Sequence, residues 1–326
     1  MISNVAPDID AMTLDSLGMN DGETFGRFDK WNALYLPFQD DAMRQTFLRR
    51  ENLSNGCLYA GLIKEVANLQ DHLVFTEMRL TVRGSHASEF SELAKWVSSN
   101  ELDKLPRNRW VIQVPRAYRV LFRKGLVKSF GELLENLFRP LFEVTIEPSR
   151  DECLYDLAFS LGGFDSVDDE SHHESVVDFQ SDPYQWTTDV EVNRKKKKKK
   201  KKLALIHCLV CKLFFFQPSY AMWLFYIKAN LSVLFALRKE RFIAPLSLRP
   251  HAGATGPASH PAAAFLLADS IVHGLTLVNT PSLHYCYYLC QIGICQAVLA
   301  ENSLYVKIRD SPFYDYFKQG MMVTLR

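Results

Sequence analysis

The stretch Ala244-Pro-Leu-Ser-Leu-Arg-Pro-His-Ala-Gly253, with Ser270-Ile-Val-His-Gly274 after it, decides the fold. A short apolar run ends in a polar tip in each, and the run between them, Ala258–Ala268, has helical character. A strand, a helix and a second strand in that order are typical of a βαβ unit with parallel strands. We therefore expect His251 and His273 at neighbouring strand ends, where both side chains point into one pocket.

The same alternation of helices and strands extends in both directions from this unit. Seven strands are expected: Val74–Val82, Arg109–Pro115, Leu157–Val167, Ala244–Arg249, Ser270–Gly274, Leu304–Arg309 and Met321–Leu325. The helices expected with them are Asp41–Gln70, Ser88–Asn100, Phe130–Phe142, Trp223–Arg241, Ala258–Ala268 and Leu283–Leu299. This pattern predicts an α/β protein, an incomplete (β/α)8 TIM-type barrel with about seven of eight strands, and leaves a doubly wound open sheet as the alternative. The barrel is preferred because polar residues cluster past several strand ends, where barrels carry their catalytic rim.

Composition narrows the class of protein. The 326 residues are 48% hydrophobic, which excludes a wholly disordered chain. Arg194–Lys202 supplies nine of the 38 basic residues, which leaves 29 basic against 37 acidic residues in the rest of the chain. Because the rest of the chain is net acidic, we expect no nucleic-acid partner. Seven cysteines are too few for a disulfide scaffold in a chain of this length, and an odd number leaves one unpaired. Residues 1–29 lack a signal-peptide pattern. A cytoplasmic location is therefore expected.

The middle of the chain breaks the rhythm of helices and strands. Eight consecutive lysines, Lys195–Lys202, cannot be buried together, and the apolar run that follows is shorter than a bilayer span. We expect an N-terminal extension at 1–29, barrel at 30–186, a disordered insertion at 187–217 and the rest of the barrel at 218–326. Attachment to a membrane through residues 195–227 is the less favoured alternative.

Two motifs carry a resemblance to a known family. Gly163-Phe-Asp165-Ser-Val-Asp168-Asp169-Glu-Ser171 and Leu248-Arg-Pro-His251-Ala-Gly253 resemble blocks of the AMP deaminases, and they occur in the family's order. The resemblance implies a (β/α)8 hydrolase in which zinc, held by three His and one Asp, activates water to convert AMP to IMP and ammonia. It also implies association into homo-oligomers.

The resemblance assigns roles residue by residue. His251 matches the third zinc-binding His, and His273 matches the His that helps to activate the metal-bound water. Asp168 matches the strand end that lines the purine pocket, and Asp169 and Gly253 are expected beside the substrate with it.

This sequence also departs from the family pattern. Ala254 stands where the family has the glutamate that protonates the purine ring, and Leu34 replaces a lysine suited to the 5′-phosphate. No His precedes His72, so the upstream His-x-His of the family is not matched, and Val323-Thr-Leu-Arg326 stops short of the zinc Asp. One zinc ligand of four is therefore expected, in a truncated chain without activity on its own. The alternative is a catalytically dead deaminase-like protein that acts by associating with intact subunits.

Overall fold

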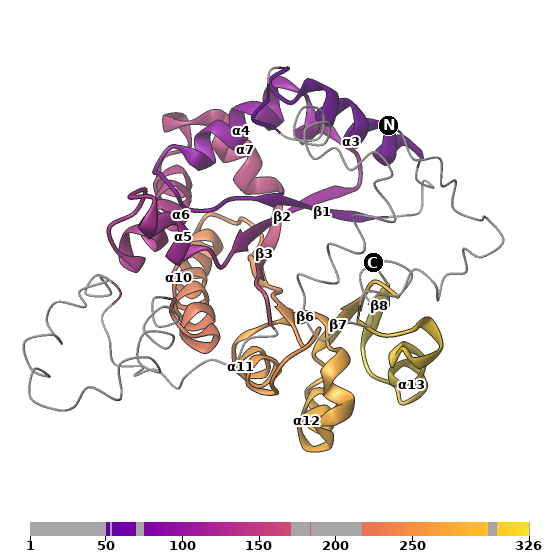
Figure 1. The fold of residues 1–326 in the computed structure, drawn as a ribbon. Helices are drawn as coiled ribbons and strands as arrows, with labels where there is room; N and C mark the ends of the chain where they lie inside the picture. Colours follow the sequence, from indigo (N-terminus) through magenta and orange to yellow (C-terminus); the bar gives the residue numbers. More distant parts are fainter. Residues whose placement is uncertain are drawn as a thin grey trace, which may run out of the picture.

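The fold is an α/β arrangement of parallel strands with helices on one side. The computed structural model describes residues 50–52, 54–69, 75–170, 183, 217–298 and 305–325. Its strands are β1 (Thr76–Thr81), β2 (Asn108–Pro115), β3 (Leu161–Val167), β4 (Ser247–Leu248), β5 (His251–Ala252), β6 (Ser270–His273), β7 (Gly293–Gln296) and β8 (Val323–Leu325). Figure 1 shows them along an arc whose outer side carries the helices.

The helices alternate with these strands. They are α3 (Cys57–Leu69), α4 (Glu89–Ser99), α5 (Tyr118–Arg123), α6 (Phe130–Ile146), α7 (Glu152–Ser160), α10 (Tyr220–Glu240), α11 (Ser259–Leu267), α12 (Pro281–Cys290) and α13 (Phe313–Lys318). Local sequence fixes several starts. The Oγ of Ser129, the N-cap of α6, accepts a hydrogen bond from the backbone N–H of Glu132. The Glu132 carboxylate accepts one from the N–H of Lys128, the residue before the N-cap.

The strands pair in chain order and all pairs are parallel. One sheet has the order β1-β2-β3-β4 and the other β5-β6-β7-β8. A doubly wound sheet reverses its strand order at a switch point, whereas a barrel does not. The sequential order therefore favours the barrel over the alternative. The described strands form an open part of it and do not close.

The break between the two sheets lies at Arg249 and Pro250. Proline has no N–H to donate to a ladder, so the strand predicted at Ala244–Arg249 is reduced to β4 and resumes as β5. His251 consequently lies within a strand and not after one. Counted as one interrupted strand, β4 and β5 bring the described total to the predicted seven.

Two sequence expectations in the last third were wrong. The strand predicted at Leu304–Arg309 is instead β7, at Gly293–Gln296, and residues 308–310 form a 3-10 turn. The helix predicted at Leu283–Leu299 ends at Cys290, because Gln291 adopts a left-handed conformation with φ of 50°. Apolar residues continue from α12 into β7, so the hydropathy pattern does not show where the helix ends and the strand begins.

Other boundaries shifted for local reasons. The strand predicted from Leu157 begins at Leu161, because the Asp151 carboxylate accepts a hydrogen bond from the N–H of Leu154 and caps α7. The helix predicted at Asp41–Gln70 is described only as α3, since residues 41–49 and 70 lie outside the described ranges. The predicted insertion at 187–217 lies outside the described residues, except for Gln217. The whole of the predicted N-terminal extension at 1–29 lies outside them too.

One core helix passes a length and hydropathy test for membrane spans. Among the described residues, α10 alone is long and apolar enough to cross a bilayer. Its buried face includes Trp223, Ile227 and Leu234, and it packs against α6 and α11. Buried Arg238 donates to the carbonyls of Ala244 and Ala158. One face of α10 therefore packs on the core, while Phe225, Val233 and Phe235 on the helix remain exposed.

Candidate functional site

Asp165 is the centre of a buried polar cluster. It lies inside β3 and is fully buried. Its Oδ1 is 2.8 Å from Nδ1 of His251, and its Oδ2 accepts hydrogen bonds from Nε of Arg79 at 2.8 Å and Nε2 of Gln113 at 3.1 Å. The cluster thus joins β1, β2, β3 and β5. Sequence reasoning placed Asp165 in a motif but gave it no role.

The cluster keeps the Asp165 carboxyl ionised. Burial alone raises its pKa, but the charge and hydrogen bond of His251, together with Arg79 and Gln113, outweigh burial and hold the pKa below its usual value. An ionised carboxylate at Nδ1 orients the imidazole and fixes which nitrogen bears the proton on that side. His251 is therefore held in one orientation by a charged partner.

The structure brings the two predicted histidines together. The rings of His251 and His273 have centroids 5.0 Å apart with 61° between their planes, and the ring of Tyr305 lies 5.8 Å beyond His273. Both histidines are buried, with exposures of 7% and 3%. They come from β5 and β6, which pair directly, so the parallel register sets their spacing.

The acidic residues after β3 have separate partners. Asp168 forms an ion pair with Arg116, whose guanidinium also donates to the carbonyl of Pro218 at 2.9 Å. Asp169 is half-buried. Thus the predicted pocket residue Asp168 is tied through Arg116 to Pro218, just before the start of α10.

Glu170 is the site residue that sequence reasoning missed. It is 3% exposed, and its Oε2 accepts hydrogen bonds from the backbone N–H groups of Gly253, at 2.5 Å, and Ala254, at 3.1 Å. Burial raises the pKa of Glu170 to about 8, the two N–H bonds oppose this, and Asp168 and Asp169 add to it. The sequence signal that could have pointed to Glu170 is the run of three consecutive acids, Asp168, Asp169 and Glu170, directly after β3. If the chain turns inward after such a run, its last acid becomes buried.

Tyr220 connects this cluster to the helical layer. Its hydroxyl donates to the carbonyl of His251 at 2.7 Å, and its ring lies 5.9 Å from the Arg116 guanidinium carbon. Burial raises the pKa of Tyr220 well above its usual value, and the charge of Glu170 adds to this. The residue therefore stays a neutral hydrogen-bond donor, and α10 fixes the backbone at His251.

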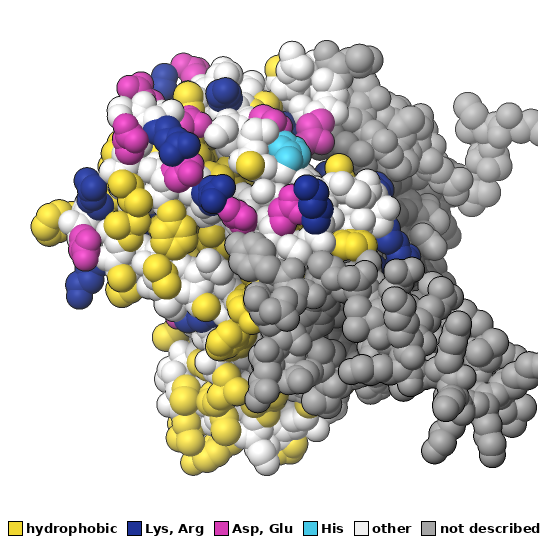
Figure 2. Space-filling view, turned by 90° about the vertical axis from the view of Figure 1, so that its left-hand side faces the viewer, with side chains coloured by type: hydrophobic (Ala, Val, Ile, Leu, Met, Phe, Trp, Pro, Cys, Tyr) yellow, Lys and Arg dark blue, Asp and Glu magenta, His cyan; other side chains and the backbone are white. Residues whose placement is uncertain are grey.

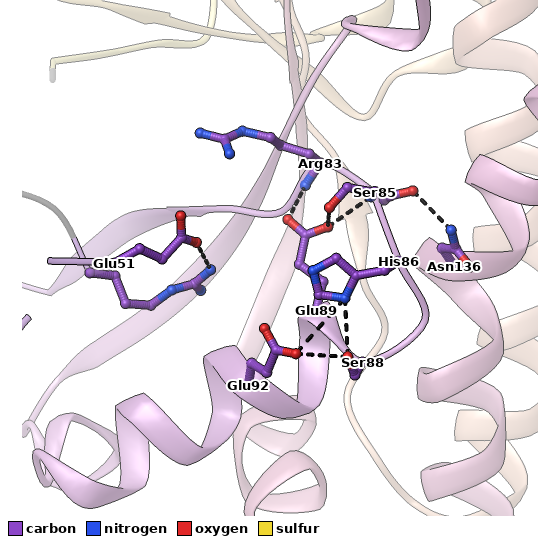
Figure 3. A network of polar contacts seen from close by, with 10 residues as sticks. Glu51, Arg83, Ser85, His86, Ser88, Glu89, Glu92 and Asn136 are labelled. Carbon is purple, nitrogen blue, oxygen red and sulfur yellow. Dashed lines mark hydrogen bonds and ion pairs between the residues drawn. The ribbon is translucent and has the colours of Figure 1, made fainter. Parts of the chain in front are cut away.

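The loop after β1 is held by a second carboxylate. Glu89, at the start of α4, accepts hydrogen bonds from the backbone N–H groups of Arg83 and Ser85, each at 2.8 Å, as Figure 3 shows. The amide of Asn136 donates to the carbonyl of Gly84 at 3.0 Å. Gly84 has φ of 73°, which disfavours other residues. This loop follows the carboxyl end of β1, in the β1–β4 sheet, whereas the two histidines lie on β5 and β6 of the other sheet.

The described residues do not complete a zinc site. No group of three His, Cys, Asp or Glu placed to hold a metal occurs in the described ranges. The carboxylate at Nδ1 of His251 is the outer support that zinc-binding histidines usually have, but one imidazole is not a ligand shell. Ala254, where the family pattern has its glutamate, is buried and offers only a methyl group. The residues present therefore do not fit a catalytic metal by themselves.

Comparison with known proteins identifies the family. The sequence model of the AMP deaminase family matches residues 6–195 and 209–326. The chain belongs to the AMP deaminase family. The matched ranges leave out residues 196–208, which include most of the lysine run.

Individual relatives agree with this assignment. The chain is 37% identical to mouse AMP deaminase 3 and 37% identical to human AMP deaminase 1, over 96% of its length in each case. It is 38% identical to the AMP deaminase of Schizosaccharomyces pombe, also over 96% of its length. It spans only 38%, 39% and 35% of those three relatives.

Solved structures of deaminases are more distant. Adenine deaminase from Arthrobacter aurescens is 12% identical, with a TM-score of 0.46 over 96% of this chain and 69% of that one. Arabidopsis N6-mAMP deaminase is 9% identical, with a TM-score of 0.49 over 96% and 78%.

Proposed function

We propose that this chain is the part of an AMP deaminase that receives the purine of AMP against the His251–His273 face. The reaction class is hydrolytic deamination of AMP to IMP and ammonia. The observation that carries the proposal is the carboxylate-oriented imidazole of His251, 5.0 Å from a second buried imidazole, in a chain of this family. Purine recognition needs hydrogen-bonding groups on a rigid scaffold, which Asp165 and the paired strands provide.

Each residue of the face has a distinct part in the proposal. Asp165 holds His251 at Nδ1, which leaves Nε2 as the nitrogen that would bind zinc in the intact family. His273 would hold the attacking water, and Asp168, Asp169 and Gly253 would line the purine pocket. In the intact family a zinc ion supplies the activated water.

We propose further that the chain alone does not turn AMP over. Ala254 cannot transfer a proton, and general acid–base groups contribute about 10²–10⁴-fold to such reactions. The described residues also lack a ligand shell for zinc. The second candidate, a catalytically dead protein that acts by association with intact subunits, is favoured by the same Ala254.

Binding and turnover are tested separately. Calorimetry of the full chain with AMP is expected to show binding that His273→Asn weakens, and no binding at all contradicts the purine site. Incubation with AMP, followed by ultraviolet absorbance and ammonia release, is expected to show no IMP. Elemental analysis after zinc saturation and desalting is expected to give well below one zinc per chain, and a stoichiometric value lost in His251→Ala contradicts this.

Assembly and location remain part of the proposal. Figure 2 shows hydrophobic side chains gathered on the lower part of one face, where α11 and α12 lie, and neither helix contains a charged residue. The exposed apolar residues there include Leu266, Tyr285 and Leu289. Exposed apolar surfaces of this kind mark interfaces, which supports the proposal of a homo-oligomer. The cytoplasmic location is proposed on the sequence alone. Light scattering across a dilution series tests it, and a strictly monomeric chain contradicts it.

A further inference from the structure

His273 adopts a backbone conformation that disfavours its own side chain. Its φ is 79°, and Gly274 after it has φ of 61°, so two consecutive residues occupy the left-handed region. For a residue with a Cβ atom this conformation is sterically unfavourable. Such a backbone persists only where surrounding contacts hold it. The turn also ends β6 and sets the direction in which the imidazole leaves the strand.

Two buried side chains from later in the chain hold this turn. The Nε2 of Gln296, at the end of β7, donates to the carbonyl of His273 at 2.9 Å. The hydroxyl of Tyr316, on α13, donates to the carbonyl of Gly274 at 2.9 Å. Both side chains are fully buried. Each of the two left-handed residues thus has its carbonyl oxygen fixed by a specific donor.

Gln296 occupies its position at a cost. Its Oε1 is buried and has no hydrogen-bond partner among the residues that the structure describes. A buried acceptor in this state has lost its hydrogen bonds to water without a replacement, whereas a methionine or leucine of similar volume would leave nothing unpaired. The other buried residue of β7, Ile294, is apolar. The hydrogen bond from Nε2 to the His273 carbonyl therefore explains why an amide side chain occupies position 296.

We infer that Gln296 is a positioning residue for His273. Its amide fixes the left-handed turn and thereby aims the imidazole of His273 at that of His251. The catalytic relevance of this contact rests on the proposed function, in which the two imidazoles face the purine of AMP. The geometric part of the inference does not depend on any ligand.

The test compares Gln296→Met with Cys295→Ala in the full chain. Gln296→Met keeps the volume and removes the donor, while Cys295→Ala changes the neighbouring half-buried residue of the same strand. With histidine-labelled protein, the nuclear Overhauser effect between the rings of His251 and His273 is expected in the wild type and in Cys295→Ala. It is expected to be lost in Gln296→Met, with displaced ring ¹⁵N shifts of His273. Retention of both signals in folded Gln296→Met overturns the inference.

Gln296→Glu provides an independent test if the methionine variant does not fold. A protonated carboxyl donates to the His273 carbonyl as the amide does, and a carboxylate cannot. The inter-ring signal of this variant is therefore expected at low pH and absent at high pH, over a range in which the wild type keeps it. An inter-ring signal with the same pH dependence in both proteins overturns the inference.

Addition of AMP separates this inference from the proposed function. AMP is expected to displace the His273 ring signals of the wild type and of Cys295→Ala, and to bind Gln296→Met about five- to tenfold more weakly, as loss of one hydrogen bond implies. If AMP disturbs no ring signal in the wild type, the proposed function fails, while the inter-ring signal still decides the role of Gln296. If AMP binds both variants equally, Gln296 has no part in ligand binding.

Discussion

Replacement of Glu170 by glutamine tests a buried acid of the site whose pKa is raised to about 8. The carboxyl is fully buried against the backbone N–H groups of Gly253 and Ala254, and its pKa rises from 4.5 to about 8. Because the folded pKa lies above the unfolded one, the folded state binds the proton more tightly. The resulting stabilisation is complete below pH 4.5 and is lost as pH rises towards 8.

The magnitude follows from the same two pKa values. A rise from 4.5 to about 8 corresponds to on the order of 5 kcal/mol of unfolding free energy, lost between those pH values. Domains of this kind have unfolding free energies of roughly 5–15 kcal/mol, so the loss is a large fraction of the total. Glutamine keeps an oxygen for the two N–H groups and does not ionise. Glu170→Gln is therefore expected to remove this pH dependence.

The assay is urea unfolding followed by circular dichroism at pH 5.5, 7 and 8.5. Other groups titrate in this range, so the quantity to compare is the difference between wild type and variant at each pH. We expect the variant to be more stable than the wild type by about 1.4 kcal/mol at pH 5.5, one unit above the unfolded pKa, and by several kcal/mol at pH 8.5. Glu65→Gln, at an exposed position on α3, is the matched control and should give no pH-dependent difference. A difference for Glu170→Gln that stays constant with pH refutes the buried, protonated carboxyl.

Four further changes have expected outcomes. Asp165→Asn removes the charge that orients the imidazole at 2.8 Å and should weaken AMP binding at least as much as His273→Asn, measured by calorimetry; unchanged affinity contradicts the orienting role. Gly163→Ala should lower the free energy of unfolding by about 1–3 kcal/mol in urea titration, because the added Cβ would lie 2.3 Å from the carbonyl oxygen of Ser247. Wild-type stability of this variant would contradict the close approach of β3 and β4. Deletion of 187–217 should raise soluble yield and preserve the α/β circular dichroism spectrum, and unfolding would place the segment in the core. Ala254→Glu alone should not convert AMP to IMP, since it supplies a proton donor without a zinc shell; turnover by this variant would mean that ligands come from within the chain.

The sequence alone determined the fold class and the family. Apolar runs that alternate between short and helical lengths predicted parallel strands separated by helices, and the motifs around Asp165 and His251 carried the family resemblance. The pairing of His251 with His273 followed as well, because neighbouring parallel strands bring their carboxyl ends to one edge. These features depend on local pattern and on the order of elements, both of which are written along the chain.

Only the tertiary structure decided which side chains meet across the sheet and which strand runs where. The Asp165 carboxylate binds side chains from three other strands. Glu170 accepts hydrogen bonds from the backbone of Gly253 and Ala254, which lie far from it in the sequence. The strand at Gly293–Gln296 was hidden because apolar residues fill both α12 and β7, so periodicity could not separate them. Gln296 gave no sequence signal, since an isolated glutamine acquires its role from burial and from the left-handed turn of His273 beside it. Contacts of this kind depend on distances between residues far apart in sequence, which no local pattern encodes.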